Sequence, residues 1–237
     1  MEFKEGIYEN LDYPTYDSIP AWRSHDLTSI AKCPFTWKNR TFNNSPALFE
    51  GRVMHTVFLE HYKFAEEFAI EPPVDRRTKV GKAEYAEWLE ELGDKDPVKQ
   101  DLYDTCMERR EVVSDYIPKG KHHVELTLCW IWNGQPCKGK LDWHTGSDVW
   151  DYKSCRDASP RGGCRAVGLP TEKFYFLAQE KQAPYPFGVY TLSDEAIAYA
   201  DAQNEQAMAI GIKCREQDLY LPYNQEGIKE FGLADLN

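Results

Sequence analysis

The sequence predicts an α/β (α+β) protein with a helical N-terminal half, about residues 1–120, and a central mixed β-sheet flanked by helices, within about residues 121–220. Two observations predict this fold class. Apolar residues recur at helical spacing through the first half, whereas apolar and β-branched runs bounded by turn residues fill the second half. No internal repeat or low-complexity linker interrupts the chain, so we expect a single domain over residues 1–237.

The first half is expected to hold four helices. Asp26 is a suitable N-cap for the first, in which Leu27, Ile30 and Ala31 follow at helical spacing. The segment from Gly93 to Pro97 is a stop and restart signal between the last two. The expected helices cover residues 26–39, 47–64, 79–92 and 97–116.

The second half is expected to supply the sheet. Strands are predicted over residues 123–132, 136–144, 148–154, 173–181 and 187–192, followed by a long helix over 194–215. We expect the tail after Tyr220 to be irregular.

Two of these strands bring together three side chains suited to metal and phosphate chemistry. Residues i and i+2 of a strand share a face, so Asp151 and Lys153 point together while Tyr152 points away. The turn at residues 145–148 folds the segment with Asp142 back beside them. Two carboxylates suit Mg²⁺, and Lys153 is placed to orient or deprotonate an attacking water and to neutralise charge on a phosphate. Taken alone, the pattern is equally consistent with a structural role, in which Asp142 and Asp151 are ordinary acids at strand ends and Lys153 is their salt-bridge partner.

Six separated segments carry a family resemblance. They are LTSIAKCP (27–34, followed by Trp37), ALFEGRVMHTVFLE (47–60), VELTLCW (124–130), KGKLD (138–142), DYKS (151–154) and FYFLAQEKQAPY (174–185). In this order they resemble the PD-(D/E)xK nuclease superfamily, and within it the exonuclease VIII (RecE-like) and RecB-type branch. The resemblance covers most of the chain and implies a restriction-endonuclease-like core.

The resemblance also implies the metal ligands. Mg²⁺, with Mn²⁺ as a substitute, would be held by Asp142, Asp151, the backbone carbonyl of Tyr152 and His55, while Lys153 activates water. Gly51, four residues before His55, is expected to let that helix approach the sheet closely enough for the imidazole to reach the metal. Without the resemblance, a histidine on an apolar helix is more often a packed core residue.

Glu125 begins the first expected core strand. This residue could be an outer metal ligand or a hydrogen-bond acceptor for one of the metal ligands. It is equally consistent with an exposed acid on a strand.

The function implied is a Mg²⁺-dependent exonuclease that digests linear double-stranded DNA from 5′ to 3′ and generates single strands for recombination in a phage or prophage. Such relatives act as rings of three or four subunits, and a single-strand annealing protein is the expected partner. The chain departs from the family in one place. Residues 155–172 contain no Gln and no Tyr, where the family has a helix with a Gln-x-x-x-Tyr pattern that contacts DNA.

The net charge of −11 argues at first against nucleic acid, whose affinity depends on phosphate contacts. Basic residues nevertheless surround the expected site, and two of the nearby acids would be neutralised by metal. The expected DNA contacts are Lys138, Lys140, Arg156 and Arg161 around the site, with Arg23, Ser29 and Lys32 in the opening segment as a receiver for a terminal 5′ phosphate. Ser29 also fits a simple capping residue.

Composition predicts a folded cytoplasmic protein. Hydrophobic residues make up 42% of the chain, which is enough for a core. The seven cysteines have no C-x-x-C spacing, so neither a disulfide framework nor a zinc knuckle is indicated. No apolar run approaches the ~18 residues that a membrane span needs, and no secretory leader is evident.

Three other interpretations stay open from the sequence. The first is a catalytically impaired relative that binds DNA or a recombination partner. The second is a RecB-type single-strand or structure-specific nuclease with the same metal site. The third is an α/β protein in which the site residues are structural.

Overall fold

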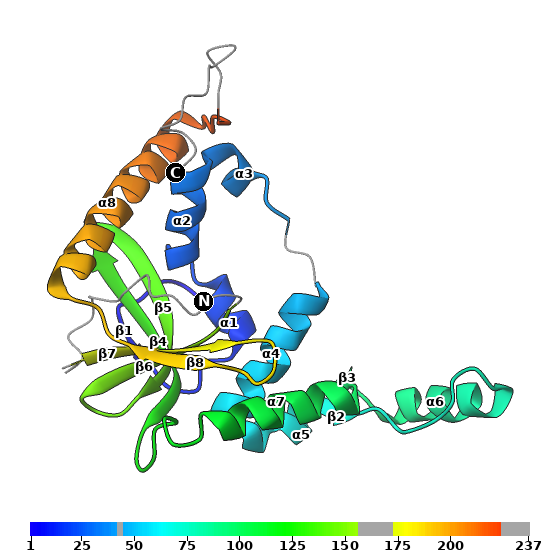
Figure 1. Cartoon of the computed structure of the whole chain (residues 1–237). Coiled ribbons are helices and arrows are strands. Elements are labelled where there is room, and N and C mark those ends of the chain that lie inside the picture. The colour runs from blue at the N-terminus through cyan, green and yellow to red at the C-terminus, as the bar shows by residue number, and fades with distance from the viewer. Residues whose placement is uncertain (42–44, 156–172, 224–237) are drawn as a thin grey trace, which may run out of the picture.

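The computed structural model describes residues 1–41, 45–155 and 173–223. A six-stranded mixed sheet lies at the centre with helices around it, so the predicted fold class is confirmed (Figure 1). The helices are α1 (Tyr13–Ser18), α2 (Ser24–Lys32), α3 (Pro34–Lys38), α4 (Pro46–Leu59), the 3₁₀ helix η1 (His61–Lys63), α5 (Phe64–Glu67), α6 (Lys79–Glu91), α7 (Gln100–Val112) and α8 (Asp194–Gln217). The strands are β1 (Gly6–Tyr8), β2 (Phe68–Ile70), β3 (Asp96–Val98), β4 (His123–Trp132), β5 (Gln135–His144), β6 (Asp148–Cys155), β7 (Lys173–Glu180) and β8 (Phe187–Tyr190).

The strands of the main sheet follow the order β1-β4-β5-β6-β7-β8. The pairing is antiparallel except between β6 and β7, which are parallel. A short second sheet pairs β2 with β3 in parallel. The main sheet is therefore mixed, with its one parallel pair beside the hairpin of β5 and β6.

The hairpin of β5 and β6 opens almost at once. Only Trp143↔Trp150 and His144↔Val149 are paired. The same register would next oppose Asp142 and Asp151, but the ladder ends there. Two carboxylates directly opposite one another repel, and the divergence of the two strands leaves space between them.

The first predicted helix is two helices. Pro34 has no N–H and disfavours the helical conformation of the residue before it, so Cys33 is extended and separates α2 from α3. Asp26 is not the N-cap that we predicted. Arg23 holds that position, and the Asp26 carboxylate accepts the backbone N–H of Arg23 at 3.0 Å from the third helical position.

Other differences are local. The helix predicted over 47–64 ends at Leu59, and η1 and α5 follow it. The helix predicted over 97–116 begins only at Gln100, because Asp96–Val98 form β3. The other predicted strands and helices agree with the structure to within two residues, whereas β1, α1 and β2 were not predicted.

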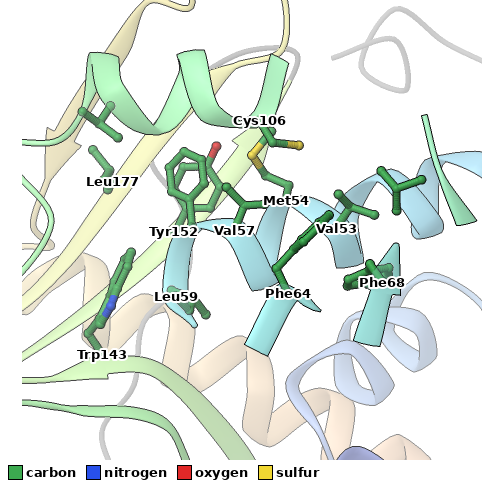
Figure 2. Packing of buried hydrophobic residues seen from close by; sticks show 13 residues of the cluster. Val53, Met54, Val57, Leu59, Phe64, Phe68, Cys106, Trp143, Tyr152 and Leu177 are labelled. Atoms are coloured by element: carbon green, nitrogen blue, oxygen red, sulfur yellow. The ribbon is translucent and has the colours of Figure 1, made fainter. Parts of the chain in front are cut away.

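The larger core lies between the sheet and the helices α4 and α7. Figure 2 shows Val57 and Met54 of α4 between Cys106 of α7 and the sheet residue Tyr152. The Phe58 ring stacks on the ring of Tyr152, with centroids 4.1 Å apart. This packing fixes α4, and with it His55, against the strand that carries Asp151.

A second core lies between α2 and α8, where Trp22, Ile30 and Met208 are buried. α8 approaches this core closely at Gly211, because a Cβ there would stand 2.6 Å from the Trp22 ring and 2.9 Å from Ile30 of α2. Among the described helices, none is both long enough and apolar enough to cross a membrane.

Candidate metal centre

Three side chains from three elements converge at the opening of the hairpin. His55 comes from α4, Glu125 from β4 and Asp142 from β5, and one ligand atom of each lies within 4.8 Å of the others. Nδ1 of His55 is 3.0 Å from Oε1 of Glu125, and Nε2 is 3.3 Å from Oδ1 of Asp142. One nitrogen and two carboxylate oxygens at this spacing can hold a divalent cation.

Asp151 and Lys153 lie beside this group on β6. Nζ of Lys153 donates to Oδ1 of Asp151 at 2.8 Å, so the two side chains point together as strand periodicity requires. The other oxygen, Oδ2 of Asp151, is buried and has no hydrogen-bond partner within the described residues. The backbone N–H of Tyr152 donates to Oδ2 of Asp142 at 2.7 Å and bridges the diverging strands.

The tyrosine between these two residues anchors β6 on the opposite side. Its hydroxyl accepts from the buried guanidinium of Arg109 at 2.9 Å and donates to Gln179 at 3.0 Å. Gln179 in turn donates to the backbone carbonyl of Arg109 at 3.0 Å. Because the Tyr152 hydroxyl both accepts and donates a hydrogen bond in this buried network, the network fixes the strand position from which Asp151 and Lys153 project.

Glu125 has an unusual backbone for a strand residue. Its φ is +53°, in the left-handed region that non-glycine residues rarely adopt, and it has no ladder partner between the pairs Val124↔Trp143 and Leu126↔Leu141. Strain of this kind costs on the order of 1–3 kcal/mol and is found at functional sites more than elsewhere. Here it coincides with a side chain held by two cations, His55 and Lys140.

The charges of the site perturb one another. Burial alone lowers the pKa of His55, but the adjacent Asp142 and Glu125 carboxylates outweigh it and raise the pKa to about 10. Burial alone raises the pKa of Glu125, but His55 and Lys140 outweigh it and lower the pKa to about 2. Without metal, the imidazole thus serves as the cation between two carboxylates.

Asp151 lacks such compensation. Burial, and then the negative charge of Asp142, raise its pKa to about 6, against the opposing effect of Lys153. A partly buried carboxylate that resists ionisation, with one oxygen lacking a partner, is the arrangement that a bound cation would relieve. The donor set of hard oxygens and one imidazole therefore fits a divalent metal.

Lys138 requires a correction. We expected it to contact DNA, but its side chain is buried, and Nζ donates to the carbonyls of Tyr16, Asp17 and Ile19 at 2.7, 2.9 and 2.7 Å. An ammonium has three donors, and all three are used. The Lys138 ammonium holds the C-terminal end of α1 and Ile19 on β5 and is not available to a phosphate.

Lys140 also faces inward. Nζ lies 2.9 Å from Oε2 of Glu125 and donates to the backbone carbonyl of Leu11 at 3.2 Å. The strand alternation that puts Lys140 and Asp142 on one face of β5 was a signal for this role. The structure joins Lys140 to the metal-site acids rather than to an exposed basic surface.

The opening segment lies partly in its own ion-pair network. Arg23 pairs with Asp17 at 2.7 Å and lies 3.6 Å from Asp26, which Arg40 also contacts. Ser29 is in the middle of α2 rather than at the helix N-terminus that the expected phosphate site requires. Lys32 is exposed in the last turn of α2. Arg156 and Arg161 lie outside the described residues.

The expected role of Gly51 is wrong. A Cβ at this position would meet nothing within 4 Å, so no close approach of α4 to the sheet depends on it. His55 reaches Glu125 and Asp142 from a helix that is positioned by its apolar residues, including Val57 and Phe58.

His144 was not singled out from the sequence. It is buried two residues after Asp142 on the same strand face, and neither ring nitrogen has a hydrogen-bond partner among the described residues. Its ring stacks near that of His123, with centroids 6.1 Å apart. Strand periodicity was the signal that could have placed it beside the site.

Comparison with known proteins identifies a fold and no family. No protein-family model matches the chain, and no curated protein does. A crystal structure of a candidate exonuclease from Eubacterium rectale is similar, with a TM-score of 0.57 and 14% identity over 97% of this chain and 98% of that chain. At this identity the likeness shows that the two chains share a fold from end to end.

Proposed function

We propose that the protein is a divalent-metal-dependent deoxyribonuclease of the PD-(D/E)xK type, and specifically a RecE-like exonuclease that digests linear duplex DNA from 5′ to 3′. The observation that carries the proposal is the meeting of His55, Glu125 and Asp142 beside the Asp151–Lys153 pair. The fold shared with a candidate exonuclease supports it. A partner protein that anneals single strands and a ring of three or four subunits belong to the same proposal and rest on the sequence resemblance.

The proposed ligands are Asp142, Asp151, His55 and the carbonyl of Tyr152, with Glu125 as a further carboxylate. When bound there, the metal supplies charge neutralisation at the scissile phosphate and lowers the pKa of water. His55 must give up the proton that Asp142 and Glu125 stabilise before its nitrogen can act as a ligand. Binding is therefore coupled to proton release at His55.

Lys153 is the proposed catalytic amine. Its side chain is 60% exposed, while its partner Asp151 is only 14% exposed, so Nζ stands at the solvent side of the carboxylate. From there Nζ can reach a phosphate or an attacking water while Asp151 restrains its position. We assign it the orientation or deprotonation of that water and the stabilisation of charge on the phosphate.

The proposal is tested by release of acid-soluble nucleotides from linear duplex labelled at the 5′ or the 3′ end, with Mg²⁺, Mn²⁺, Ca²⁺ or EDTA. We expect release that requires Mg²⁺ or Mn²⁺ and begins at the 5′ label. Release that begins at the 3′ label, or that prefers single strands, would replace the RecE-like assignment with a RecB-type one. The variant Lys153→Ala should release no nucleotides above background.

A second candidate is a relative that binds DNA without cleaving it. It is favoured by residues 155–172, which lack the Gln and Tyr of the family pattern. The same assay separates the two. A folded protein that binds Mn²⁺ and duplex DNA, but releases nothing from either label, is the outcome that favours binding alone.

A further inference from the structure

The two lysines at the metal centre differ in exposure. The Lys153 side chain is 60% exposed and contacts Asp151 from the solvent side. The Lys140 side chain is only 18% exposed, and its Nζ lies 2.9 Å from Oε2 of Glu125. Lys140 is therefore a fixed cation within the site, whereas Lys153 has room to move toward a substrate.

The Glu125 carboxylate lies between two cationic groups. Its Oε1 is 3.0 Å from Nδ1 of His55, on the side of the proposed metal, and its Oε2 faces Lys140. The left-handed backbone of Glu125, with a φ of +53°, holds the carboxylate in this place at a cost in strain. Nuclease sites with two metal ions also bring two cations close together among shared acids. Here one of the two cations is an ammonium of the chain itself.

Anchoring of the N-terminal segment does not account for Lys140. Lys138, two residues earlier on the same face of β5, already holds that segment with three hydrogen bonds to backbone carbonyls of α1 and Ile19. Lys140 adds one longer hydrogen bond, of 3.2 Å, to the carbonyl of Leu11. Its closer partner is the carboxylate of Glu125, and the Leu11 carbonyl restricts where Nζ can lie.

The charges of the site balance with a single divalent ion. The carboxylates of Glu125, Asp142 and Asp151 carry three negative charges, and Lys140 and Lys153 carry two positive ones. A metal-bound imidazole is neutral, so one divalent ion leaves one positive charge, which the scissile phosphodiester balances. A second divalent ion would leave two positive charges without compensation in a partly buried site, which is unfavourable.

We propose that Lys140 takes the place of a second metal ion, so that the site binds one divalent cation per chain. The inference rests on the proposed nuclease function and makes Lys140 a positioning residue. Its ammonium holds Glu125 beside His55 and supplies positive charge that a second ion would otherwise bring. A neutral residue at position 140 would leave Oε2 of Glu125 and the carbonyl of Leu11 without this cation, and both are hard oxygens that suit a divalent ion.

The test counts the Mn²⁺ ions bound by the full-length protein, by titration calorimetry and by electron paramagnetic resonance of the free ion. The parent should bind one ion per chain. Lys140→Met keeps the length of the side chain and removes its charge, so a second ion should bind at least about 100-fold more tightly than to the parent. Lys140→Glu adds a carboxylate and should bind the second ion more tightly still, whereas Lys140→Arg keeps the charge and should bind one.

The matched control is Lys121→Met, which removes the same charge at an exposed position and should bind one ion. Thermal midpoints in EDTA show which variants are folded. One ion bound by folded Lys140→Met or Lys140→Glu would mean that Lys140 is only structural and overturns the proposal. Two ions bound by the parent also overturn it and leave the nuclease assignment intact. A parent that binds no ion overturns the metal centre itself, and this inference with it.

Discussion

The two ends of β5 use buried charge in opposite ways. At one end, the Lys138 ammonium has three carbonyl acceptors at 2.7–2.9 Å, one for each of its protons. At the other end, the Asp142 carboxylate lies near those of Glu125 and Asp151, and burial together with the charge of Asp142 raises the pKa of Asp151 to about 6. The first charge is satisfied by backbone carbonyls, whereas the three carboxylates are balanced by His55, Lys140 and Lys153 only while His55 holds a proton.

From this difference we infer a structural role for Lys138 and propose a functional one for Asp142. A buried ion with a complete set of partners stabilises one conformation and has nothing left to offer a ligand. Carboxylates that lie close together and depend on a histidine proton for balance can instead be neutralised by a bound cation. Lys138 and Asp142 lie on the same strand, and sequence alone did not distinguish their roles.

The largest expected effect is loss of cleavage in Asp142→Asn. The amide oxygen can still accept the Tyr152 N–H, so the fold should persist, but the negative charge beside His55 is gone. We expect nucleotide release to fall by about 10³-fold. The control Asp148→Asn removes the same charge from the same hairpin and should cleave at the parental rate. Equal cleavage rates for Asp142→Asn and the parent would show that the catalytic site lies elsewhere in the protein.

Substitution of Lys138, toward the opposite end of β5, should lower the stability of the protein. Lys138→Met leaves two buried carbonyls and one partly buried carbonyl without their donor, and we expect the free energy of unfolding to fall by about 3 kcal/mol in urea denaturation. Cleavage per folded molecule should not change, because Nζ contacts no site residue. The exposed Lys4→Met serves as the control. A stable Lys138→Met protein with weakened DNA affinity would reverse the roles that we assign to the two ends.

A bound metal should stabilise the protein only through the carboxylates around Asp142 on β5. At a Mn²⁺ concentration of 100 times its dissociation constant, the expected gain is about 2.7 kcal/mol, seen as a rise in Tm that Asp142→Asn lacks. His55, with a pKa raised to about 10, must release its proton to bind metal, so affinity should increase from pH 6 to pH 9. Titration calorimetry in two buffers of different ionisation enthalpy measures the proton release. Metal binding without proton release would exclude His55 from the ligands.

A smaller effect is expected from Asp151→Asn, and it is a gain in stability. The folded pKa of Asp151, about 6, lies above the ordinary 3.8, so the folded state holds this proton more tightly than the unfolded state. Stability is therefore lost as pH rises from about 4 to 6, and the loss is complete above pH 6. Without metal, the variant should exceed the parent by about 1–2 kcal/mol at pH 7.5 and equal it near pH 3.5. Urea midpoints at the two pH values measure this difference, and no gain at pH 7.5 would mean that Asp151 is already compensated.

The sequence predicted those parts of the site that depend on local periodicity. The i, i+2 rule placed Lys153 beside Asp151, and the turn at 145–148 brought Asp142 back to them. It did not predict that β5 and β6 separate after two residue pairs, because that follows from repulsion between side chains that meet only in the folded sheet. The family resemblance pointed to His55, but the reason offered through Gly51 was wrong, because apolar packing of α4 decides its distance from the sheet.

The roles of the cationic side chains were the hardest to predict from the sequence. Lys138 and Lys140 alternate along one strand like a basic surface, yet both are used inside the protein, since the segment containing Tyr16 and Leu11 covers that face. That segment is about 120 residues away in sequence, and no local sequence pattern predicts where it packs.

The sequence by itself determined the alternation of strands, the extents of α6 and α8 and the order of the acids along the hairpin, because these depend on contacts between near neighbours. The tertiary structure decided which charges have a complete set of partners and which carboxylates are crowded together. That distinction depends on the low dielectric of the interior and on partners from distant segments, so only the folded chain shows that the three Lys138 protons are all used while Asp142, Glu125 and Asp151 lie close enough together to suit a bound cation.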